Sequence, residues 1–167
     1  IPSDWSVLSG NRDQWSSANG VITGHSTTGE SILASTKQYR NVTLSGILSS
    51  TNRGADLAIR MQDADNGYLV TVTPDGTPWA AENGSIIKLV RKVAGTELNL
   101  AQFKRSNLPQ SAKITVIAKG PQFEVRLNDT AVLQARDTKF AAGYIGVRVY
   151  GDPVKPSDAA FSHLTVR

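Results

Sequence analysis

A chain of 167 residues with 40% hydrophobic and 19% charged residues has the composition of one globular domain and excludes an intrinsically disordered chain. The 18 Lys and Arg against 14 Asp and Glu give a net charge of +4. Because the basic residues are scattered, no nucleic-acid partner is predicted. The absence of cysteine excludes disulfides, thiol nucleophiles and thiolate metal sites. No apolar run approaches the roughly 18 residues that span a bilayer, so no membrane partner is expected.

Short strands separated by turns are predicted for the first third of the chain. They cover residues 3–8, 14–16, 18–25, 31–35 and 40–49. Trp5 and Trp15 lie where apolar and polar residues alternate, so we expect them in the core or at a sheet edge rather than as a platform for a sugar ring. Glu30 stands where a loop leads into a strand.

Residues 54–72 are predicted to form the hairpin around which the rest of the chain is organised. Leu57, Ile59 and Met61 recur at every second position, which places them together on the inward face of a half-buried strand. Arg60 lies mid-strand on the opposite face, which also carries a carboxylate and an amide. This hairpin therefore has one apolar face and one polar face.

The hairpin turn at residues 63–67 has the sequence Asp-Ala-Asp-Asn-Gly, which is typical of a tight turn. It also resembles the start of a calcium-binding loop, but its glycine comes one place early and no glutamate stands at the twelfth position. We therefore expect a turn. A structural calcium held by backbone carbonyls elsewhere is left open, and no other cofactor is expected.

The second half of the chain continues the same pattern. Further strands are predicted at residues 85–93, 113–119, 122–127, 130–134, 143–150 and 159–166. Residues 73–84 form a loop rich in Pro and Gly with Trp79 in its middle. A tryptophan in such a loop either offers a stacking surface for a ring or anchors the loop against the domain, and the sequence leaves both open.

The spacing of these elements predicts an all-β fold. About twelve short strands alternate with turns, and no segment of twelve or more residues has helical periodicity. We expect residues 1–167 to form a single domain, a two-sheet antiparallel β-sandwich of jelly-roll type. The absence of a Cys, Trp, Cys pattern argues against an immunoglobulin domain.

A series of short motifs runs along nearly the whole chain, at residues 4–5, 14–15, 29–35, 57–61, 66–68, 143–150 and 160–161. Taken together, these motifs resemble the family 66 carbohydrate-binding modules. Those modules are concanavalin A-like sandwiches, related in outline to laminin G-like domains and best known as fructan-binding appendages of exo-acting fructosidases such as levanase. The resemblance implies a non-catalytic module that binds a polysaccharide or oligosaccharide.

The resemblance also implies a small polar site for a terminal sugar. Glu30 matches an acidic residue of a Gly-acidic-Ser motif, and Arg60 matches the arginine of the strand before Asn-Gly-Tyr. Asp158 matches an acidic residue before the last strand, and Asp152 is the alternative because the preceding segment is longer than usual. A carboxylate and a guanidinium can each bind two adjacent sugar hydroxyls. A structural ion pair on the sheet surface is the alternative.

An apolar wall beside these polar residues is expected from Tyr150 or Trp79. The corresponding prediction is that Arg60→Ala abolishes sugar binding while leaving the fold intact.

Two other functions remain open from the sequence. Related sandwich domains include hydrolases of 3-keto-disaccharides, for which Glu30 and Asp158 could form a carboxylate pair. The Glu-x-Asp-x-Glu string of sandwich glucanases does not occur, and His25 and His163 are too far apart in sequence to favour a triad or zinc site. A laminin G-like adhesion domain would instead carry an apolar surface patch.

The chain begins with Ile rather than Met, so we expect it to be a module of something longer. The resemblance suggests a monomeric appendage of a glycoside hydrolase or other carbohydrate-active enzyme. Its expected location is extracellular, by secretion.

Overall fold

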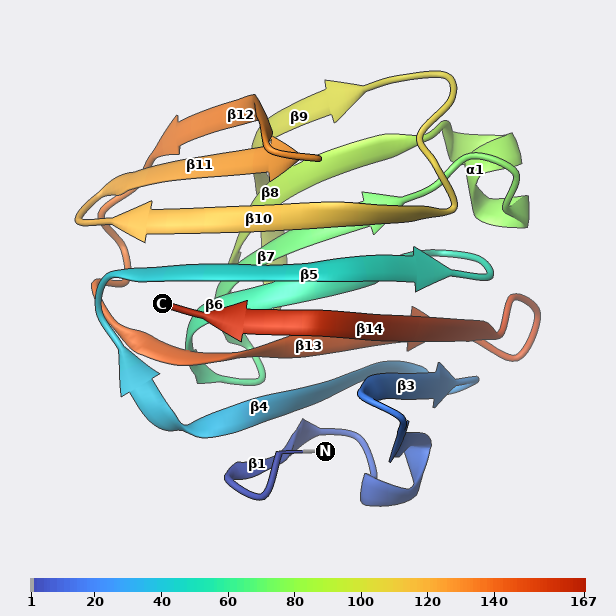
Figure 1. The fold of residues 1–167 in the computed structure, drawn as a ribbon, viewed down its shortest axis with the longest axis horizontal. Helices are drawn as coiled ribbons and strands as arrows, with labels where there is room; N and C mark the ends of the chain where they lie inside the picture. Colours follow the sequence, from blue (N-terminus) through green and yellow to red (C-terminus); the bar gives the residue numbers. More distant parts are fainter. Residues whose placement is uncertain (1) are drawn as a thin grey trace.

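The computed structural model describes residues 2–167, which form two antiparallel sheets of seven strands packed face to face (Figure 1). In spatial order, sheet A contains β1 (Trp5–Ser9), β4 (Gly29–Tyr39), β13 (Gly143–Gly151), β6 (Ala55–Asp63), β7 (Asn66–Thr73), β8 (Ile86–Val93) and β9 (Thr96–Lys104). Sheet B contains β12 (Thr130–Arg136), β11 (Gln122–Leu127), β10 (Ser111–Lys119), β5 (Val42–Ser50), β14 (Ser157–Val166), β3 (Val21–Ser26) and β2 (Trp15–Ala18). The all-β, two-sheet antiparallel sandwich expected from the sequence is confirmed.

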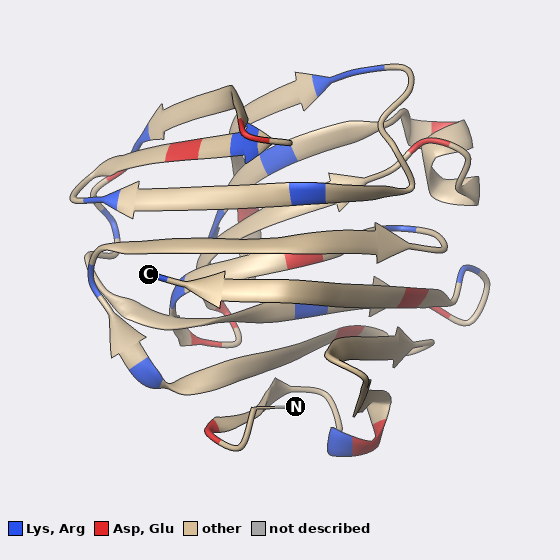
Figure 2. Ribbon diagram, in the orientation of Figure 1, with Lys and Arg blue, Asp and Glu red and all other residues tan. Residues whose placement is uncertain are grey.

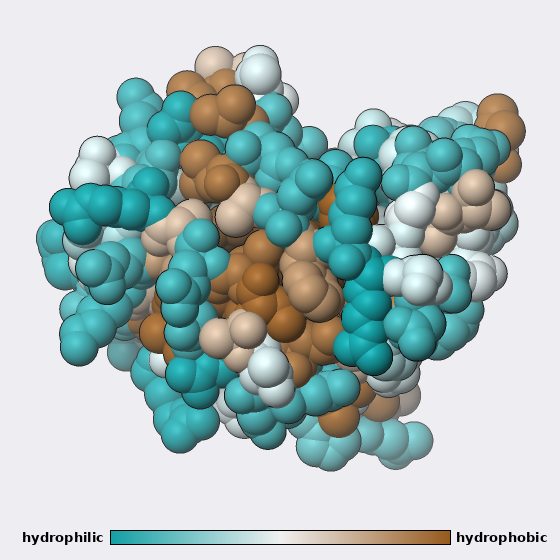
Figure 3. All heavy atoms as spheres, turned by 90° about the horizontal axis from the view of Figure 1, so that it is seen from above, coloured by the Kyte–Doolittle hydropathy of each residue, from teal (hydrophilic) through white to brown (hydrophobic). Residues whose placement is uncertain are grey.

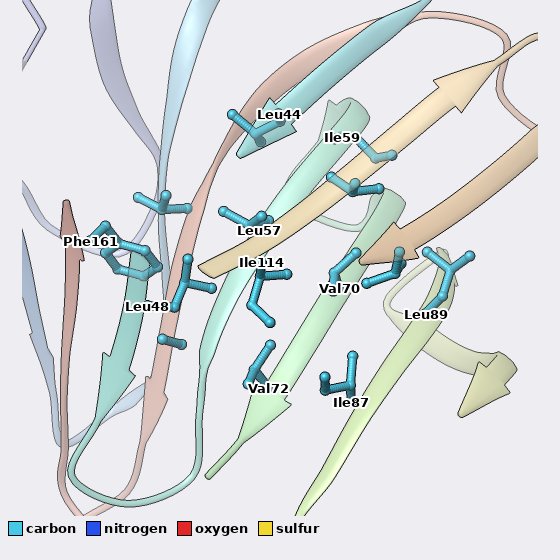
Figure 4. Close-up of a cluster of buried hydrophobic side chains, with 14 of the residues drawn as sticks. Leu44, Leu48, Leu57, Ile59, Val70, Val72, Ile87, Leu89, Ile114 and Phe161 are labelled. Atoms are coloured by element: carbon cyan, nitrogen blue, oxygen red, sulfur yellow. The ribbon is translucent and has the colours of Figure 1, made fainter. Parts of the chain in front are cut away.

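The core lies between the sheets and is built from every second residue of each strand. Figure 4 shows Leu57, Val70 and Leu89 of sheet A facing the sheet B side chains Leu44 and Ile114. All five are fully buried, and burying one such side chain contributes roughly 1.5–3 kcal/mol relative to leaving it exposed. The period-2 pattern of the sequence therefore positions the core.

The two tryptophans near the N-terminus pack as expected. Trp15 is buried, and its Nε1 donates to the Ser31 hydroxyl at 2.7 Å. Trp5 is partly buried against the core at the β1 edge of sheet A. Both residues therefore contribute to packing, Trp15 in the core and Trp5 at the sheet edge.

Two elements differ from the sequence-based expectation. Residues 73–84 are not all loop, because Pro78–Asn83 form a short helix, α1. Thr77 caps this helix by accepting from the Ala80 amide at 3.1 Å, while Pro78 occupies its first turn and Gly84 ends it at φ +85°. A helix of one and a half turns is too short to show a helical periodicity in the sequence.

Strand β9 was also not among the expected strands.

The open end of the sandwich lies between the edge strands β9 and β12. Figure 3 looks onto this end and shows apolar side chains between two hydrophilic flanks. Leu100, Val132 and Ala135 of these strands are partly buried and pack against the core. Among residues 2–167, no helix is long and apolar enough to cross a membrane.

A β-bulge in β6 changes which way Arg60 points. Ile59 pairs with Tyr68 of β7, but the register resumes only at Asp63 with Asn66. Arg60 takes a left-handed conformation at φ +50° inside this irregularity. A bulge interrupts the alternation of side chains between the two faces of a strand, so a residue expected on the outer face can turn inward.

Arg60 is accordingly buried at the edge of the core, with 1% of its surface exposed. Its Nε donates to the Arg40 carbonyl at 3.0 Å and its Nη1 to the Phe140 carbonyl at 3.2 Å. The guanidinium lies 5.2 Å from the centre of the Phe123 ring, and burial lowers its pKa. The expectation of an outward-facing Arg60 was therefore wrong, and this arginine supports the fold.

The same bulge moves Met61 out of the inward face. Met61 packs with Ile32, Ala58, Leu69 and Val90 in a second buried cluster, separate from the main core. The expectation that Met61 shares a face with Leu57 was wrong for the same reason, a shift of register within the strand.

Tyr68 ties the segment between β12 and β13 to the core. Its hydroxyl donates to Asp137 Oδ1 at 2.5 Å and accepts from the Phe140 amide at 3.2 Å. Arg91 Nη1 donates to the other carboxylate oxygen, Asp137 Oδ2, at 2.7 Å. Burial, together with the neighbouring Asp137 carboxylate, raises the pKa of Tyr68 to about 12.

We expect Arg60→Ala to lower the free energy of unfolding by about 3 kcal/mol or more, because it opens a cavity and strands two carbonyls. Urea denaturation measures this loss. Arg40→Ala is the matched control, since the exposed Arg40 contributes only its backbone carbonyl to the contact. An Arg60→Ala protein as stable as the control would contradict this role.

The Tyr68 contact predicts a loss of stability at alkaline pH. Because the folded-state pKa of Tyr68 lies above the ordinary value of 10, its contribution is complete below about pH 10 and is lost as pH rises towards 12. Urea denaturation from pH 8 to 12 should show that the stability difference between the wild type and Tyr68→Phe narrows over this window. Tyr39→Phe, which removes the hydroxyl of a half-buried tyrosine away from Asp137, is the matched control for the substitution itself. A difference between wild type and Tyr68→Phe that stays constant from pH 8 to 12 would contradict the prediction.

Candidate functional site

A pocket of about 320 Å³ lies on the face of sheet A that is turned away from sheet B. Its floor comes from strands in register: Asp56 of β6 pairs with Thr71 of β7, Thr71 with Lys88 of β8, and Lys88 with Gln102 of β9. Residues paired directly across neighbouring strands share one face of a sheet. The floor is therefore a row of polar side chains on rigid strands.

Arg148 of β13 is the centre of this floor and is buried. Its Nε donates to Asp56 Oδ2 at 2.7 Å, its Nη1 lies 3.0 Å from Glu30 Oε2, and its Nη2 lies 3.0 Å from Glu97 Oε1. Lys92 extends the network, because its Nζ donates to the Glu30 carboxylate at 2.8 Å. Three carboxylates and two cations thus form one connected group.

The surroundings of Arg148 and Asp56 affect their protonation differently. Burial lowers the pKa of Arg148, but the charges of Asp56, Glu97 and Glu30 outweigh burial and hold it above the ordinary value. Burial raises the pKa of Asp56, and the attraction to Arg148 opposes this only in part. Both pKa values are raised, which favours the charged form of Arg148 but the neutral form of Asp56. Charge outweighs burial only at Arg148, because it has three carboxylates around it, whereas Asp56 shares one guanidinium with two other acids. Arg148 is therefore a permanent positive charge in the floor.

One wall of the pocket is a cation–π stack in which two aromatic rings contact one guanidinium. The Arg53 guanidinium lies 4.1 Å from the centre of the Trp79 ring and 4.0 Å from that of Tyr150. Cation–π contacts of this kind contribute about 0.5–2 kcal/mol each. These contacts join Arg53, Trp79 and Tyr150 into one group.

Helix α1 holds Trp79 in this wall. The Trp79 amide donates to Oδ1 of the buried Asn52 at 2.9 Å. Lys155 Nζ lies 5.3 Å from the centre of the Trp79 ring and also pairs with Glu82 of the helix. Of the two roles that the sequence left open for this tryptophan, the structure shows the anchoring one. The Trp79 ring also lines the pocket, with the cations of Arg53 and Lys155 against it.

The structure brings together only part of the site expected from the sequence. Tyr150 and Trp79 line the pocket. Glu30 adjoins it through Arg148, so the arginine beside Glu30 is Arg148 and not Arg60. The signal for Arg148 was present in the alternation of residues 143–150, which puts it on the same face as Tyr150.

The other two carboxylates considered for the site lie elsewhere. Asp158 belongs to β14 of sheet B, where it pairs with His25 Nδ1 at 2.6 Å, and both side chains are exposed. The Asp152 carboxylate accepts from the amides of Val154 and Lys155 within its own turn. The polar site expected from Glu30, Arg60 and Asp158 therefore does not form, nor does a catalytic pair of Glu30 and Asp158.

Residues 63–67 form the predicted turn, in which Asp63 Oδ1 accepts from the Asp65 amide at 2.8 Å. Within the described residues there is no group of three or more His, Asp or Glu side chains placed to hold a metal ion.

Comparison with known proteins gives one family and several similar structures. The model of the 3-keto-alpha-glucoside-1,2-lyase-like domain family matches residues 2–167. A search of curated protein sequences gives no match. The resemblance to the family 66 modules is confirmed by structure, since the carbohydrate-binding module CBM66 from Bacillus subtilis superposes with a TM-score of 0.80 at 24% identity, covering 98% of this chain and 95% of that one.

Other similar structures share the sandwich at lower identity. A candidate glycosyl hydrolase from Parabacteroides distasonis has a TM-score of 0.67 at 16% identity, with 98% of both chains covered. The carbohydrate recognition domain of Emp46p has a TM-score of 0.66 at 14% identity, with 96% of this chain and 87% of that chain covered. These similarities establish the lectin-like sandwich fold.

We expect Arg148→Met to lower the free energy of unfolding by about 3–5 kcal/mol, because it leaves the buried Asp56 carboxylate without its counter-ion. Arg148→Met combined with Asp56→Leu should recover part of this loss, as measured by urea denaturation. Arg126→Met is the matched control, since Arg126 forms a more exposed pair with Glu124 on sheet B. A loss no larger than that of the control would show that the network does not support the fold.

Proposed function

We propose that this chain, which belongs to the family of 3-keto-alpha-glucoside-1,2-lyase-like domains, is a carbohydrate-binding domain whose ligand occupies the pocket on the outer face of sheet A. The observation that carries this proposal is the pocket itself, in which a polar floor meets an aromatic wall on a lectin-like scaffold. Sugars need this combination because they present both hydroxyls and apolar C–H groups.

The polar lining suits hydroxyl groups. Lys88 donates only, whereas the amides of Asn99 and Gln102 both donate and accept. The edges of the Trp79 and Tyr150 rings add apolar contact. These groups stand on strands or are held by the stack, so little ordering is needed on binding.

The size of the pocket indicates what it can hold. Its volume of 320 Å³ lies near the lower limit of about 300 Å³ for small-molecule sites. We therefore propose that the pocket holds one or two sugar rings, such as those at the end of a glycan chain. Affinity should be modest, on the order of micromolar to millimolar, because few sugar atoms are buried.

The resemblance to the family 66 modules supports a more specific version of the proposal. In that version the ligand is the terminal sugar of a fructan or a similar polysaccharide. The domain would then be a secreted appendage that targets an attached carbohydrate-active enzyme.

Catalysis is a second candidate function. The lyase activity in the description of the matched family and the raised pKa of Asp56 both favour it. Elimination across C1 and C2 of a 3-keto-glucoside needs a base to remove the C2 proton. In this structure Asp56 is 4% exposed and binds Arg148, and Glu30 and Glu97 bind the same guanidinium. The engagement of all three carboxylates favours binding over catalysis.

An adhesion domain is less well supported. The large hydrophobic residues that the described part of the chain exposes most are Leu98, Val154 and Val166, and they belong to three separate segments. The apolar side chains between β9 and β12 (Figure 3) are partly buried against the core.

Calorimetric titration with fructans, arabinans, glucans and their monosaccharides, together with an assay for product release, tests the proposal. Binding without turnover is expected. Release of product from a 3-keto-glucoside would instead establish catalysis, and absence of binding to every glycan would overturn the proposal.

For the glycan that binds, Trp79→Ala should weaken binding at least about tenfold, because the wall loses one side of its stack. Circular dichroism should show a retained fold. Lys119→Ala on the exposed surface of sheet B is the control and should bind as the wild type does. Unchanged binding by Trp79→Ala would place the ligand elsewhere.

A further inference from the structure

The pocket is lined by three cationic side chains that form no ion pair within residues 2–167. These are Arg53 in the wall, Lys88 in the floor and Lys104 at the end of β9. The nine ion pairs in the described part of the chain involve other residues. These three cations, unlike Arg148, are thus not neutralised by direct contact with an acid.

The acidic residues of the pocket, in contrast, are already engaged. Asp56 and Glu97 are the two carboxylates in its lining, and both bind Arg148. When Glu30 and Lys92 of the same network are included, five cations stand against three carboxylates, a local balance of +2. The charges that remain free to meet a ligand are therefore positive.

Arg53 is already oriented to bind. Its guanidinium is in contact with two rings, at 4.1 Å from the centre of Trp79 and 4.0 Å from that of Tyr150, and these contacts restrict its side chain while its N–H groups form no ion pair within residues 2–167. An arginine fixed in this way loses little freedom on binding, and its planar fork matches the geometry of carboxylate, sulfate and phosphate oxygens.

Lys88 stands among neutral hydrogen-bonding groups. It is paired with Thr71 on one side and Gln102 on the other. A ligand reaching Lys88 with an anionic group therefore also meets groups that can bind hydroxyls. Figure 2 shows that acidic and basic residues are distributed over both sheets, so the excess of free cations in this pocket is a local property rather than part of a basic surface.

We propose that the sugar bound here carries an anionic group, a carboxylate, sulfate or phosphate, which lies among Arg53, Lys88 and Lys104. The ring hydroxyls are bound by Gln102 and Asn99. This inference rests on the proposed carbohydrate-binding function and specifies its ligand class as acidic sugars or glycans.

Calorimetric titration with matched sugars tests this inference. The probes are methyl glycosides in the gluco and galacto series. In each series the neutral sugar with its hydroxymethyl group is compared with the corresponding carboxylate, 6-sulfate and 6-phosphate. Polygalacturonate and neutral galactan form a further pair of probes. At 50 mM salt the acidic member of a pair should bind about tenfold more tightly than the neutral one. This preference should shrink at 500 mM salt. Comparison of the carboxylate, sulfate and phosphate probes identifies which anionic group is preferred.

Lys88→Gln should reduce the preference for the acidic sugar about fivefold or more while changing neutral-sugar binding little. Lys119→Gln, which removes an exposed lysine of sheet B, should keep the preference. An acidic preference that persists unchanged in Lys88→Gln would overturn the assignment to these cations.

The results separate this inference from the function on which it rests. Neutral glycans binding as tightly as their acidic partners, or more tightly, would overturn the acidic ligand class and leave the carbohydrate-binding function standing. No binding to any neutral or acidic glycan would overturn both.

Discussion

The ion pairs around Arg148 are the interaction on which the pocket depends. Burying a guanidinium costs free energy of desolvation unless carboxylates balance its charge and accept hydrogen bonds from its N–H groups. Here three carboxylates match it, one each from β4, β6 and β9. These strands are far apart in the sequence, and their common contact fixes the relative positions of four strands of sheet A. The ion pairs in the floor of the pocket therefore also stabilise sheet A.

The same network determines the chemistry that the pocket can offer. Because Arg148 engages Asp56, Glu30 and Glu97, these acids are poorly available as proton donors or bases for a substrate. The remaining groups are the unpaired cations, the Thr71 hydroxyl and the amides of Asn99 and Gln102, which share one hydrogen bond at 2.9 Å and keep further donors and acceptors. In this domain the carboxylates of the pocket thus hold Arg148 and the floor in place.

Rigid strands and irregular segments contribute differently to the site. The strands supply the floor, where register across β6, β7, β8 and β9 aligns the polar side chains. The wall comes from the loop that carries Arg53, from α1 and from the end of β13. It is fixed by the stacking of Trp79, Arg53 and Tyr150 and by the hydrogen bond of the Trp79 amide to Asn52. Specificity can therefore change through the wall without disturbing the floor.

The sequence by itself determined most of the strands, the sandwich and most of the core, because period-2 alternation and turn residues are local properties. It also placed Tyr150 and Arg148 on one face. Only the tertiary structure decided which arginine joins Glu30. Arg60 turns inward because a bulge shifts the register within β6, and no local pattern marks that shift. The contact of Arg148 with Glu30 joins residues 118 positions apart, and its existence depends on the order and register of strands that only the folded sheets establish.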